Sequence, residues 1–235
     1  MVFYDKDSNK YTYSIEDKKP FGEGMKAKIY KISRSECLKV LHCDPNCYFD
    51  EDTFSEIKSL SLKGLVRLGT PFYSGGKLKD YIMEYIEKSK VSILDMPIDY
   101  TLDNINALYN DLSILADNSI EVHDLFEGNL IVGSSKVTLI DLDDYVKRPS
   151  ADKKMTLYSN TWFLLYAFKR LYQAELMRKG YDLFTTSKDN ITINNCLSDM
   201  FDYNIDEIEY KTNPAVKTKR KLQGVKTPIE LFTEK

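Results

Sequence analysis

Three polar residues have types and spacings that could carry chemistry. Asp124 and Asn129 are five positions apart, and Asp141 follows twelve positions later, behind the apolar residues 137–140. A carboxylate can accept the proton of an attacking hydroxyl. A carboxylate and an amide oxygen are hard ligands that suit Mg²⁺ or Mn²⁺ better than zinc. This set of groups therefore predicts phosphoryl transfer supported by a divalent cation.

The elements expected around these residues are short strands and two helices. Residues 130–132 and 137–140 are apolar and flank a Gly-Ser-Ser turn, which predicts a hairpin. Residues 103–116 carry leucine and isoleucine at helical spacing. Residues 161–177 form an apolar, aromatic stretch that predicts a buried helix. We expect its aromatic stripe to lie in the core: Trp162, Phe163 and Tyr166.

The first part of the chain favours strands instead. Residues 10–16, 27–32 and 36–41 alternate between apolar and polar side chains, and residues 72–86 form two such stretches around Ser-Gly-Gly. A single helix is predicted at residues 54–62. The pattern changes near Glu87, so we expect an α+β fold with a β-rich part at 1–86 and an α-rich part at 87–235.

The segment around Asp124 resembles the catalytic region of the protein-kinase-like superfamily. There, His-Arg-Asp is followed five residues later by Asn and, after a hairpin, by Asp-Phe-Gly. The resemblance implies that Asp124 is the catalytic aspartate and that Asn129 and Asp141 bind the metal. It also implies a bilobal kinase-like fold with ATP between a β-rich N-lobe containing one helix (1–86) and a reduced α-helical C-lobe (87–235).

The same resemblance implies a set of nucleotide-binding residues in the first part of the chain. These are Gly22, Gly24 and Ala27 in the glycine-rich loop, Ile29 against the base, Lys39 on the phosphates with Glu56 as its ion-pair partner, Met83 as gatekeeper, and the backbone of Glu84 and Ile86 at the adenine. Each motif alone is weak. Their order along the chain, each on the expected strand or helix, strengthens the resemblance.

Several positions depart from the protein-kinase pattern. Val122 and His123 replace His-Arg, and Phe126 stands where Ser/Thr kinases carry a lysine. Asp-Phe-Gly is replaced by Asp-Leu-Asp, ending at Asp143, which is closer to aminoglycoside phosphotransferase-like kinases. Only 18 residues separate Asp141 from Asn160, which stands where protein kinases carry Asp, and they contain no Ala-Pro-Glu.

These observations predict an ATP- and Mg²⁺-dependent kinase that transfers the γ-phosphoryl group to a hydroxyl acceptor. A compact atypical Ser/Thr protein kinase, of a bacterial or phage type, is favoured. One alternative is a small-molecule phosphotransferase of the aminoglycoside or choline kinase type. Another is a pseudokinase that acts as a nucleotide-binding or scaffold module. The acceptor, a protein or a small molecule, stays open, as does the oligomeric state.

Composition limits the other functions. The chain has 235 residues with 33 basic and 36 acidic side chains, so we expect binding to neither nucleic acid nor a membrane. No apolar run is long enough for a membrane span, and neither a signal peptide nor a disulfide framework is indicated, so a cytoplasmic location is expected. His42, Cys43 and Cys47 match no strong zinc pattern. His123 is expected to be structural, and the basic run at 217–226 a solvated tail.

Overall fold

The computed structural model describes residues 1–42, 49–181, 183, 193, 195, 197–198, 200–201 and 227–229. The chain divides into two compact units. Unit 1 comprises Met1–Leu62, Val66–Ile86 and Leu142–Lys147, and unit 2 comprises Lys63–Leu65, Glu87–Asp141 and Arg148–Lys235. Neither unit is continuous in sequence, because Lys63–Leu65 belongs to unit 2 and Leu142–Lys147 belongs to unit 1. The division into two lobes at residues 86 and 87 stays a prediction.

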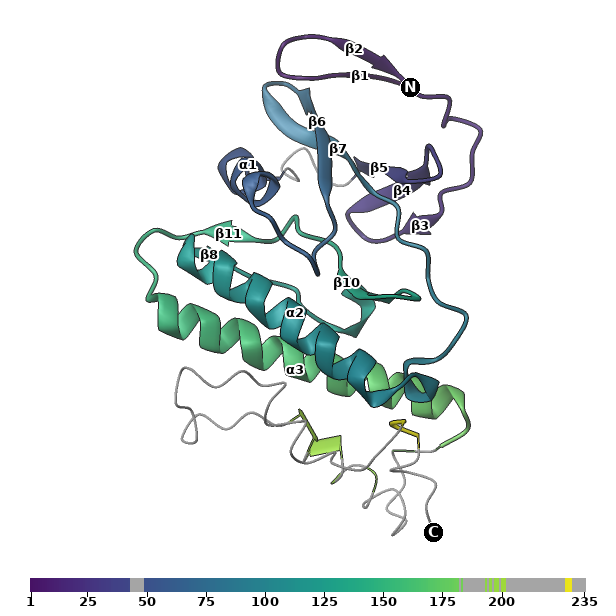
Figure 1. Ribbon diagram of the computed structural model, residues 1–235. Coiled ribbons are helices and arrows are strands. Elements are labelled where there is room, and N and C mark those ends of the chain that lie inside the picture. Colours follow the sequence, from purple (N-terminus) through teal and green to yellow (C-terminus); the bar gives the residue numbers. More distant parts are fainter. Residues whose placement is uncertain are drawn as a thin grey trace. The chain divides into compact units, whose positions relative to one another are not determined.

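Unit 1 is built on a five-stranded antiparallel sheet of order β3-β4-β5-β7-β6 (Figure 1). The strands are β3 (Gly22–Glu23), β4 (Ala27–Lys31), β5 (Glu36–Leu41), β6 (Leu68–Ser74) and β7 (Lys77–Glu84). The predicted strands at 27–32 and 36–41 are confirmed as β4 and β5. In the ladder, Lys39 of β5 lies opposite Ile29 on one side and Tyr81 on the other. All three side chains therefore share one face of the sheet.

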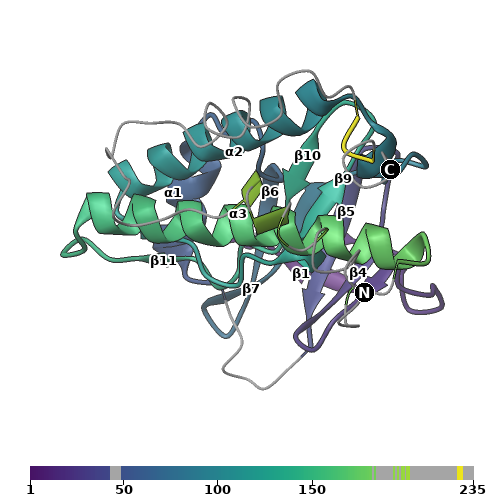
Figure 2. The ribbon, with the colours of Figure 1, turned by 90° about the horizontal axis from the view of Figure 1, so that it is seen from below.

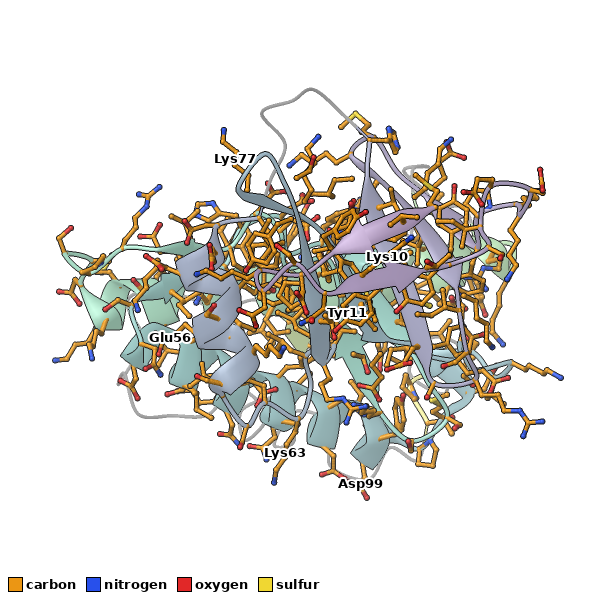
Figure 3. All side chains as sticks on the ribbon, turned by 90° about the horizontal axis from the view of Figure 1, so that it is seen from above. Lys10, Tyr11, Glu56, Lys63, Lys77 and Asp99 are labelled. Carbon is orange, nitrogen blue, oxygen red and sulfur yellow. The ribbon has the colours of Figure 1, made fainter. Side chains whose placement is uncertain are left out.

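The opposite face carries an apolar core. A hairpin of β1 (Val2–Tyr4) and β2 (Lys10–Thr12) packs there, with Phe3 against Phe72 at a ring distance of 5.3 Å. Figure 3 labels Lys10 and Tyr11 on β2. The buried residues of this core are Phe3, Ile15, Leu38, Phe72 and Ile82. The strand predicted at 10–16 is shorter than expected, because only Lys10–Thr12 pair with β1.

Helix α1 (Glu51–Ser59) of unit 1 packs on the Lys39 face of the sheet. Phe54 of α1 lies edge-on to Tyr81, at 5.5 Å between rings. The Asp50 side chain accepts the Thr53 amide at 2.8 Å, which caps the helix. This cap explains why α1 starts three residues before the predicted helix at 54–62, and the helix also ends earlier, at Ser59.

Unit 2 contains two long helices, α2 (Ile98–Asp117) and α3 (Lys153–Arg178), which lie side by side in both ribbon views (Figures 1 and 2). The hydroxyls of Thr101 and Tyr172 form a buried hydrogen bond of 2.7 Å between them. The helix predicted at 103–116 is confirmed within α2. The helix predicted at 161–177 begins earlier, because Asp152 caps α3 by accepting the Lys154 amide at 2.8 Å.

β9 (Leu130–Val132) and β10 (Val137–Leu139) form a hairpin, as the sequence predicts. The Asn104 side chain accepts the Val137 amide at 2.6 Å. Short elements complete the described part of the two units: the 3₁₀ turns η1 (Ile93–Asp95) and η2 (Glu127–Asn129), and the two-residue strands β8 (Ile120–Glu121) and β11 (Val146–Lys147). No helix among the described residues combines the length and apolar character needed to cross a bilayer.

The expectation that the aromatic stripe of α3 is core is wrong. Trp162, Phe163 and Tyr166 are 41%, 39% and 44% exposed. The Trp162 and Tyr166 rings instead stack on each other, at 5.4 Å and 5° between planes. Because α3 carries apolar residues around most of its circumference, side-chain type alone does not mark its buried face, which is formed by Leu164, Ala167, Phe168 and Leu171.

Candidate active site

Asp124 and Asn129 are brought together by a tight loop that ends in η2. The Asn129 side chain is buried, and its Nδ2 donates to the Asp124 carbonyl at 2.8 Å. The same Nδ2 lies 3.5 Å from Asp124 Oδ2. The amide nitrogen of Asn129 is therefore used within the loop, and its Oδ1 is the atom that can act toward a cation.

The hairpin places Asn129 beside the residue that precedes Asp141. The Ile140 amide donates to the Asn129 carbonyl at 2.9 Å, one step beyond the last β9–β10 pair. Asp124 and Asp141 both adopt left-handed backbone conformations, with φ of 57° and 65°. Such values cost a non-glycine residue of order 1 kcal/mol and often mark functional positions. Thus all three predicted residues lie on one loop-and-hairpin element of unit 2.

Asn160 of α3 anchors the start of this loop. Its Oδ1 accepts the Val122 amide at 3.2 Å, two residues before Asp124. His123 lies 3.4 Å from Glu121, which also pairs with Arg148 at 3.1 Å. The His123 ring thus lies at the surface beside the Glu121–Arg148 ion pair, and its structural role stays a prediction.

Lys39 lies in unit 1 and forms a buried ion pair with Asp143. Lys39 Nζ is 2.5 Å from Asp143 Oδ2, and the two side chains are 4% and 7% exposed. The Tyr81 hydroxyl donates to the other oxygen, Asp143 Oδ1. The ammonium of Lys39 also lies 5.7 Å from the Tyr81 ring centroid. A carboxylate, a phenol and a lysine therefore form one compact buried group on this face of the sheet.

The structure gives Lys39 and Glu56 different partners, so their expected ion pair stays a prediction. Glu56, labelled on α1 in Figure 3, pairs with Lys147 at 2.7 Å, and both side chains are partly exposed. The physical reason is the course of the segment Leu142–Lys147, which belongs to unit 1. Its Asp143 supplies the buried carboxylate for Lys39, and its Lys147 supplies the cation for Glu56.

The predicted glycine-rich loop is the turn between β3 and β4. Gly24 donates its amide to the Ala27 carbonyl at 2.9 Å, which closes the turn, and Ala27 is buried. Gly22 lies opposite Ile29 in the ladder. A Cβ atom added at Gly24 would meet nothing within 4 Å, and neither glycine has a positive φ. The backbone of this turn is thus left uncovered without a conformational need for glycine, which suits a phosphate contact.

The turn is also connected to the chain that follows Asp141. Lys26 Nζ lies 2.5 Å and 2.7 Å from the two carboxylate oxygens of Asp144, which belongs to unit 1. Asp143 and Asp144 therefore bind two different lysines of the sheet, one buried and one partly exposed.

The predicted adenine-binding segment is the end of β7 and the residues after it. Met83 is buried and faces the same side as Tyr81, two residues before it. The Glu84 amide donates to the Arg67 carbonyl at 2.9 Å. The Glu84 amide is therefore already used within unit 1, and a contact of Glu84 with a nucleotide base stays a prediction. Ile86 is the last residue of its segment in unit 1, and its role stays a prediction.

Sequence reasoning missed the parts played by Asp143, Tyr81 and Lys147. Asp143 was noted only as a departure from Asp-Phe-Gly. The usable signal was strand alternation, since a lysine at 39 and a tyrosine at 81 on the inward face of paired strands need a polar partner. Its supply by Asp143 depends on the path of Leu142–Lys147, which local pattern does not reveal.

Metal sites rich in several ionisable ligands are not found within the described ranges. There, no three His, Cys, Asp or Glu side chains gather closely enough to hold an ion. The predicted ligand pair of Asn129 and Asp141 has an amide as one ligand, so it is a different kind of site and stays a prediction. Cys43, Cys47 and the basic run at 217–226 lie outside the described residues.

Comparisons with known proteins give little beyond this geometry. No protein-family model and no curated protein matches the chain. A solved structure of the Legionella pneumophila Lpg2603 kinase bound to IP6 matches at 18% identity and a TM-score of 0.45, over 71% of this chain. The chain spans 65% of that kinase, just under two thirds. A match at this TM-score does not establish a shared fold.

Proposed function

We propose that the chain is an ATP- and Mg²⁺-dependent phosphotransferase that moves the γ-phosphoryl group to a hydroxyl acceptor. The observation that carries this proposal is the loop-and-hairpin element of unit 2. It fixes the Asn129 side chain on Asp124 and ends at Asp141, with both aspartates in left-handed conformations.

The oxygens of this element suit a hard divalent cation. Because Asn129 Nδ2 donates to Asp124, the free Oδ1 of Asn129 and the carboxylate of Asp141 are the candidate ligands. When bound, Mg²⁺ would neutralise charge on the phosphates. Asn129 and Asp141 would hold it, and the hydrogen bond to Asp124 fixes the Asn129 amide so that little side-chain entropy is lost on binding.

The remaining residues have distinct roles in this proposal. Lys39 would contact phosphate oxygens, and the open side of the β3–β4 turn at Gly24 would let the backbone approach them. Asp124 would orient the acceptor hydroxyl and take its proton. The acceptor oxygen bonds to the γ-phosphorus as the bond from that phosphorus to the ADP oxygen breaks.

We favour a protein Ser/Thr hydroxyl as the acceptor, in an atypical protein kinase. A small-molecule hydroxyl is the second candidate. The Lys39–Asp143 ion pair favours this candidate, because Asp143 is the second aspartate of the Asp-x-Asp pattern, which resembles that of aminoglycoside phosphotransferase-like kinases. The same ion pair also favours the pseudokinase alternative. Asp143 already occupies the Lys39 ammonium, so phosphate oxygens would have to compete with this carboxylate.

Transfer of labelled phosphate from ATP tests the proposal. Purified chain with Mg²⁺ is assayed against casein, against an aminoglycoside and choline, and for self-phosphorylation. We expect transfer to one class, lost in Asp141→Ala and kept in Asp103→Ala, a change at an exposed aspartate of α2. Undiminished transfer in Asp141→Ala contradicts the proposal.

A thermal-shift measurement separates the pseudokinase alternative. A ligand that binds the native state raises the melting temperature by mass action. Stabilisation by ATP and Mg²⁺ without transfer to any acceptor supports a nucleotide-binding pseudokinase. No stabilisation by any nucleotide, together with no transfer, overturns the assignment to ATP chemistry.

A further inference from the structure

Unit 2 contains a pocket that the proposed chemistry does not use. Its volume is about 460 Å³, within the range of small-molecule sites. Among the described residues, its lining comes from the segment from Lys88 to Asp95, the chain from Glu127 to Val132, and the C-terminal part of α3. Asp124, Asn129 and Asp141 are not among the lining residues.

The walls of this pocket are fixed by hydrogen bonds. The Ser89 amide donates to the Val132 carbonyl at 2.7 Å, joining the first wall to β9. The Ser92 hydroxyl donates to Glu175 Oε2 at 2.8 Å, joining the same wall to α3. Lys179 closes a third contact with Asp95 at 2.8 Å. The pocket is therefore preformed, and a ligand would not need to order its walls.

The pocket has an apolar part among its polar and charged lining residues. Ile93, Leu130, Val132 and Leu171 contribute side chains whose residues are less than a tenth exposed, and Ala174 leaves room on the helix side. These side chains favour a ligand with a flat or branched hydrocarbon group, because burying apolar surface away from water stabilises the complex.

The acidic side chains at the pocket are paired, whereas two of its lysines are not paired within the described residues. Each acidic lining residue has a cationic neighbour: Asp95 pairs with Lys179, Glu175 with Arg178, and Glu127 with Arg170 at 3.7 Å. Lys88 and Lys90 are exposed and have no ion pair in the described part of the chain. Within the described residues, the pocket thus combines an apolar part with two lysines that have no acidic partner.

We infer that this pocket binds a small anionic molecule with an apolar body, a carboxylate or phosphate ester whose charge meets Lys88 and Lys90. The inference does not depend on the proposed phosphotransfer. If the chain does transfer phosphate, a ligand in this pocket could affect that reaction, because Glu127 and Gly128 line the pocket and Asn129 follows them directly in the chain. Either a phosphoryl acceptor or an effector has this chemistry.

Binding of 2-naphthyl phosphate to the full chain, measured by calorimetry without ATP, tests the inference. The comparison probes are 2-naphthol, which lacks the charge, and inorganic phosphate, which lacks the apolar body. We expect 2-naphthyl phosphate to bind more tightly than either, because only it uses both the interior and the lysines. Equal or weaker affinity for 2-naphthyl phosphate overturns the inference.

Two variants locate the binding. Lys88→Glu/Lys90→Glu should weaken 2-naphthyl phosphate at least about tenfold, the effect of losing roughly one charge-assisted contact. The matched control Lys18→Glu/Lys19→Glu makes the same change of net charge at exposed lysines that do not line the pocket. Ala174→Phe should fill the pocket and remove binding. If the lysine double variant folds and binds unchanged, the inference is wrong.

A further comparison separates this test from the proposed function and identifies the source of the ligand. Asp141→Ala should bind 2-naphthyl phosphate as the wild-type chain does, even if it transfers no phosphate. A chain that binds the probe but never uses ATP leaves the pocket assignment intact. In an active chain, 2-naphthyl phosphate competing with the acceptor indicates an acceptor site, and a change in turnover without competition indicates an effector site.

Discussion

Lys39 and Asp143 form a buried ion pair in which Nζ and Oδ2 are 2.5 Å apart. Asp143 comes from the segment directly after Asp141 and is held a second time by the Tyr81 hydroxyl. Lys39, a buried lysine on the inner face of the sheet, thus pairs with a carboxylate of this segment, whereas the Glu56 carboxylate of helix α1 pairs with Lys147.

Asp143→Asn should impair phosphate transfer more than Glu56→Gln does. Removing one partner of a buried pair leaves an uncompensated charge, so Asp143→Asn should lower the free energy of unfolding by about 3 kcal/mol. Glu56→Gln breaks a partly exposed pair with Lys147 and should cost less than about 1 kcal/mol. Urea unfolding and steady-state kinetics with varied ATP measure both effects.

The kinetic signature of this pair distinguishes positioning from stability. Asp143→Asn should raise the KM for ATP or lower kcat at a temperature where the variant is fully folded. If Glu56→Gln is the more damaging of the two, Glu56 orients Lys39 during turnover and the pairing found here is not the active one.

Asn160 should act through the position of Asp124. Asn160→Leu removes the acceptor of the Val122 amide, and it also removes Nδ2, which is buried without a hydrogen-bond partner among the described residues. These effects oppose each other, so the free energy of unfolding should change by less than about 2 kcal/mol, while kcat falls at unchanged KM for ATP. Asn160→Asp, which keeps an acceptor, should restore part of kcat. Equal kcat in the leucine variant and the wild type would contradict this role.

Asp80 should make unit 1 less stable as the pH rises. Its side chain accepts the Leu41 amide at 3.0 Å, but burial dominates and raises its pKa to about 6 from an ordinary 3.8. A carboxyl with a raised pKa favours the folded state most below pH 3.8, and that contribution is lost as the pH increases through 6. Asp80→Asn should therefore gain roughly 1–2 kcal/mol at pH 8, a discounted value because Asp80 is partly exposed.

The gain from Asp80→Asn should shrink when unfolding is measured at pH 5, where wild-type Asp80 is largely protonated in the folded state. Asp99→Asn, at an exposed aspartate of α2 labelled in Figure 3, is the control and should show no such pH trend. A gain that is constant between pH 5 and pH 8 would be inconsistent with burial of the charged form.

Trp162 is the only tryptophan, so its fluorescence reports on the exposed stripe of α3 directly. Its emission should lie close to that of tryptophan in water and should be quenched readily by iodide. Trp162→Ala should cost less than about 1 kcal/mol of stability, whereas Phe168→Ala, in the core, should cost about 3–5 kcal/mol. Blue-shifted emission that iodide does not quench would place this ring in an apolar environment instead.

Local sequence pattern predicted which segments form strands and helices more accurately than it predicted where helices begin and which of their faces are buried. Alternation placed β4 and β5, because each strand has one face against a core. The start of α1 was missed by three residues because Asp50, rather than the apolar pattern, sets the first turn. The exposed face of α3 was missed because the helix is apolar on several sides, and only packing decides which side is buried.

In the candidate site, too, local contacts could be predicted from the sequence and a long-range contact could not. Asp124, Asn129 and Asp141 could be found because a loop and a short hairpin bring them together within eighteen residues of chain. The partner of Lys39 could not, because it depends on where Leu142–Lys147 runs after the hairpin. Local patterns constrain contacts inside one supersecondary unit, whereas long-range ion pairs depend on the assembled tertiary structure.

The left-handed conformations of Asp124 and Asp141 also set a conflict between durability and activity. Glycine occupies this backbone region without steric cost, so Asp124→Gly and Asp141→Gly should each relax the chain. A laboratory selection for heat resistance alone would be free to discard these two side chains early. Retention of both aspartates under such a selection would indicate that contacts of their side chains, such as that of Asp124 with Asn129, outweigh the backbone strain.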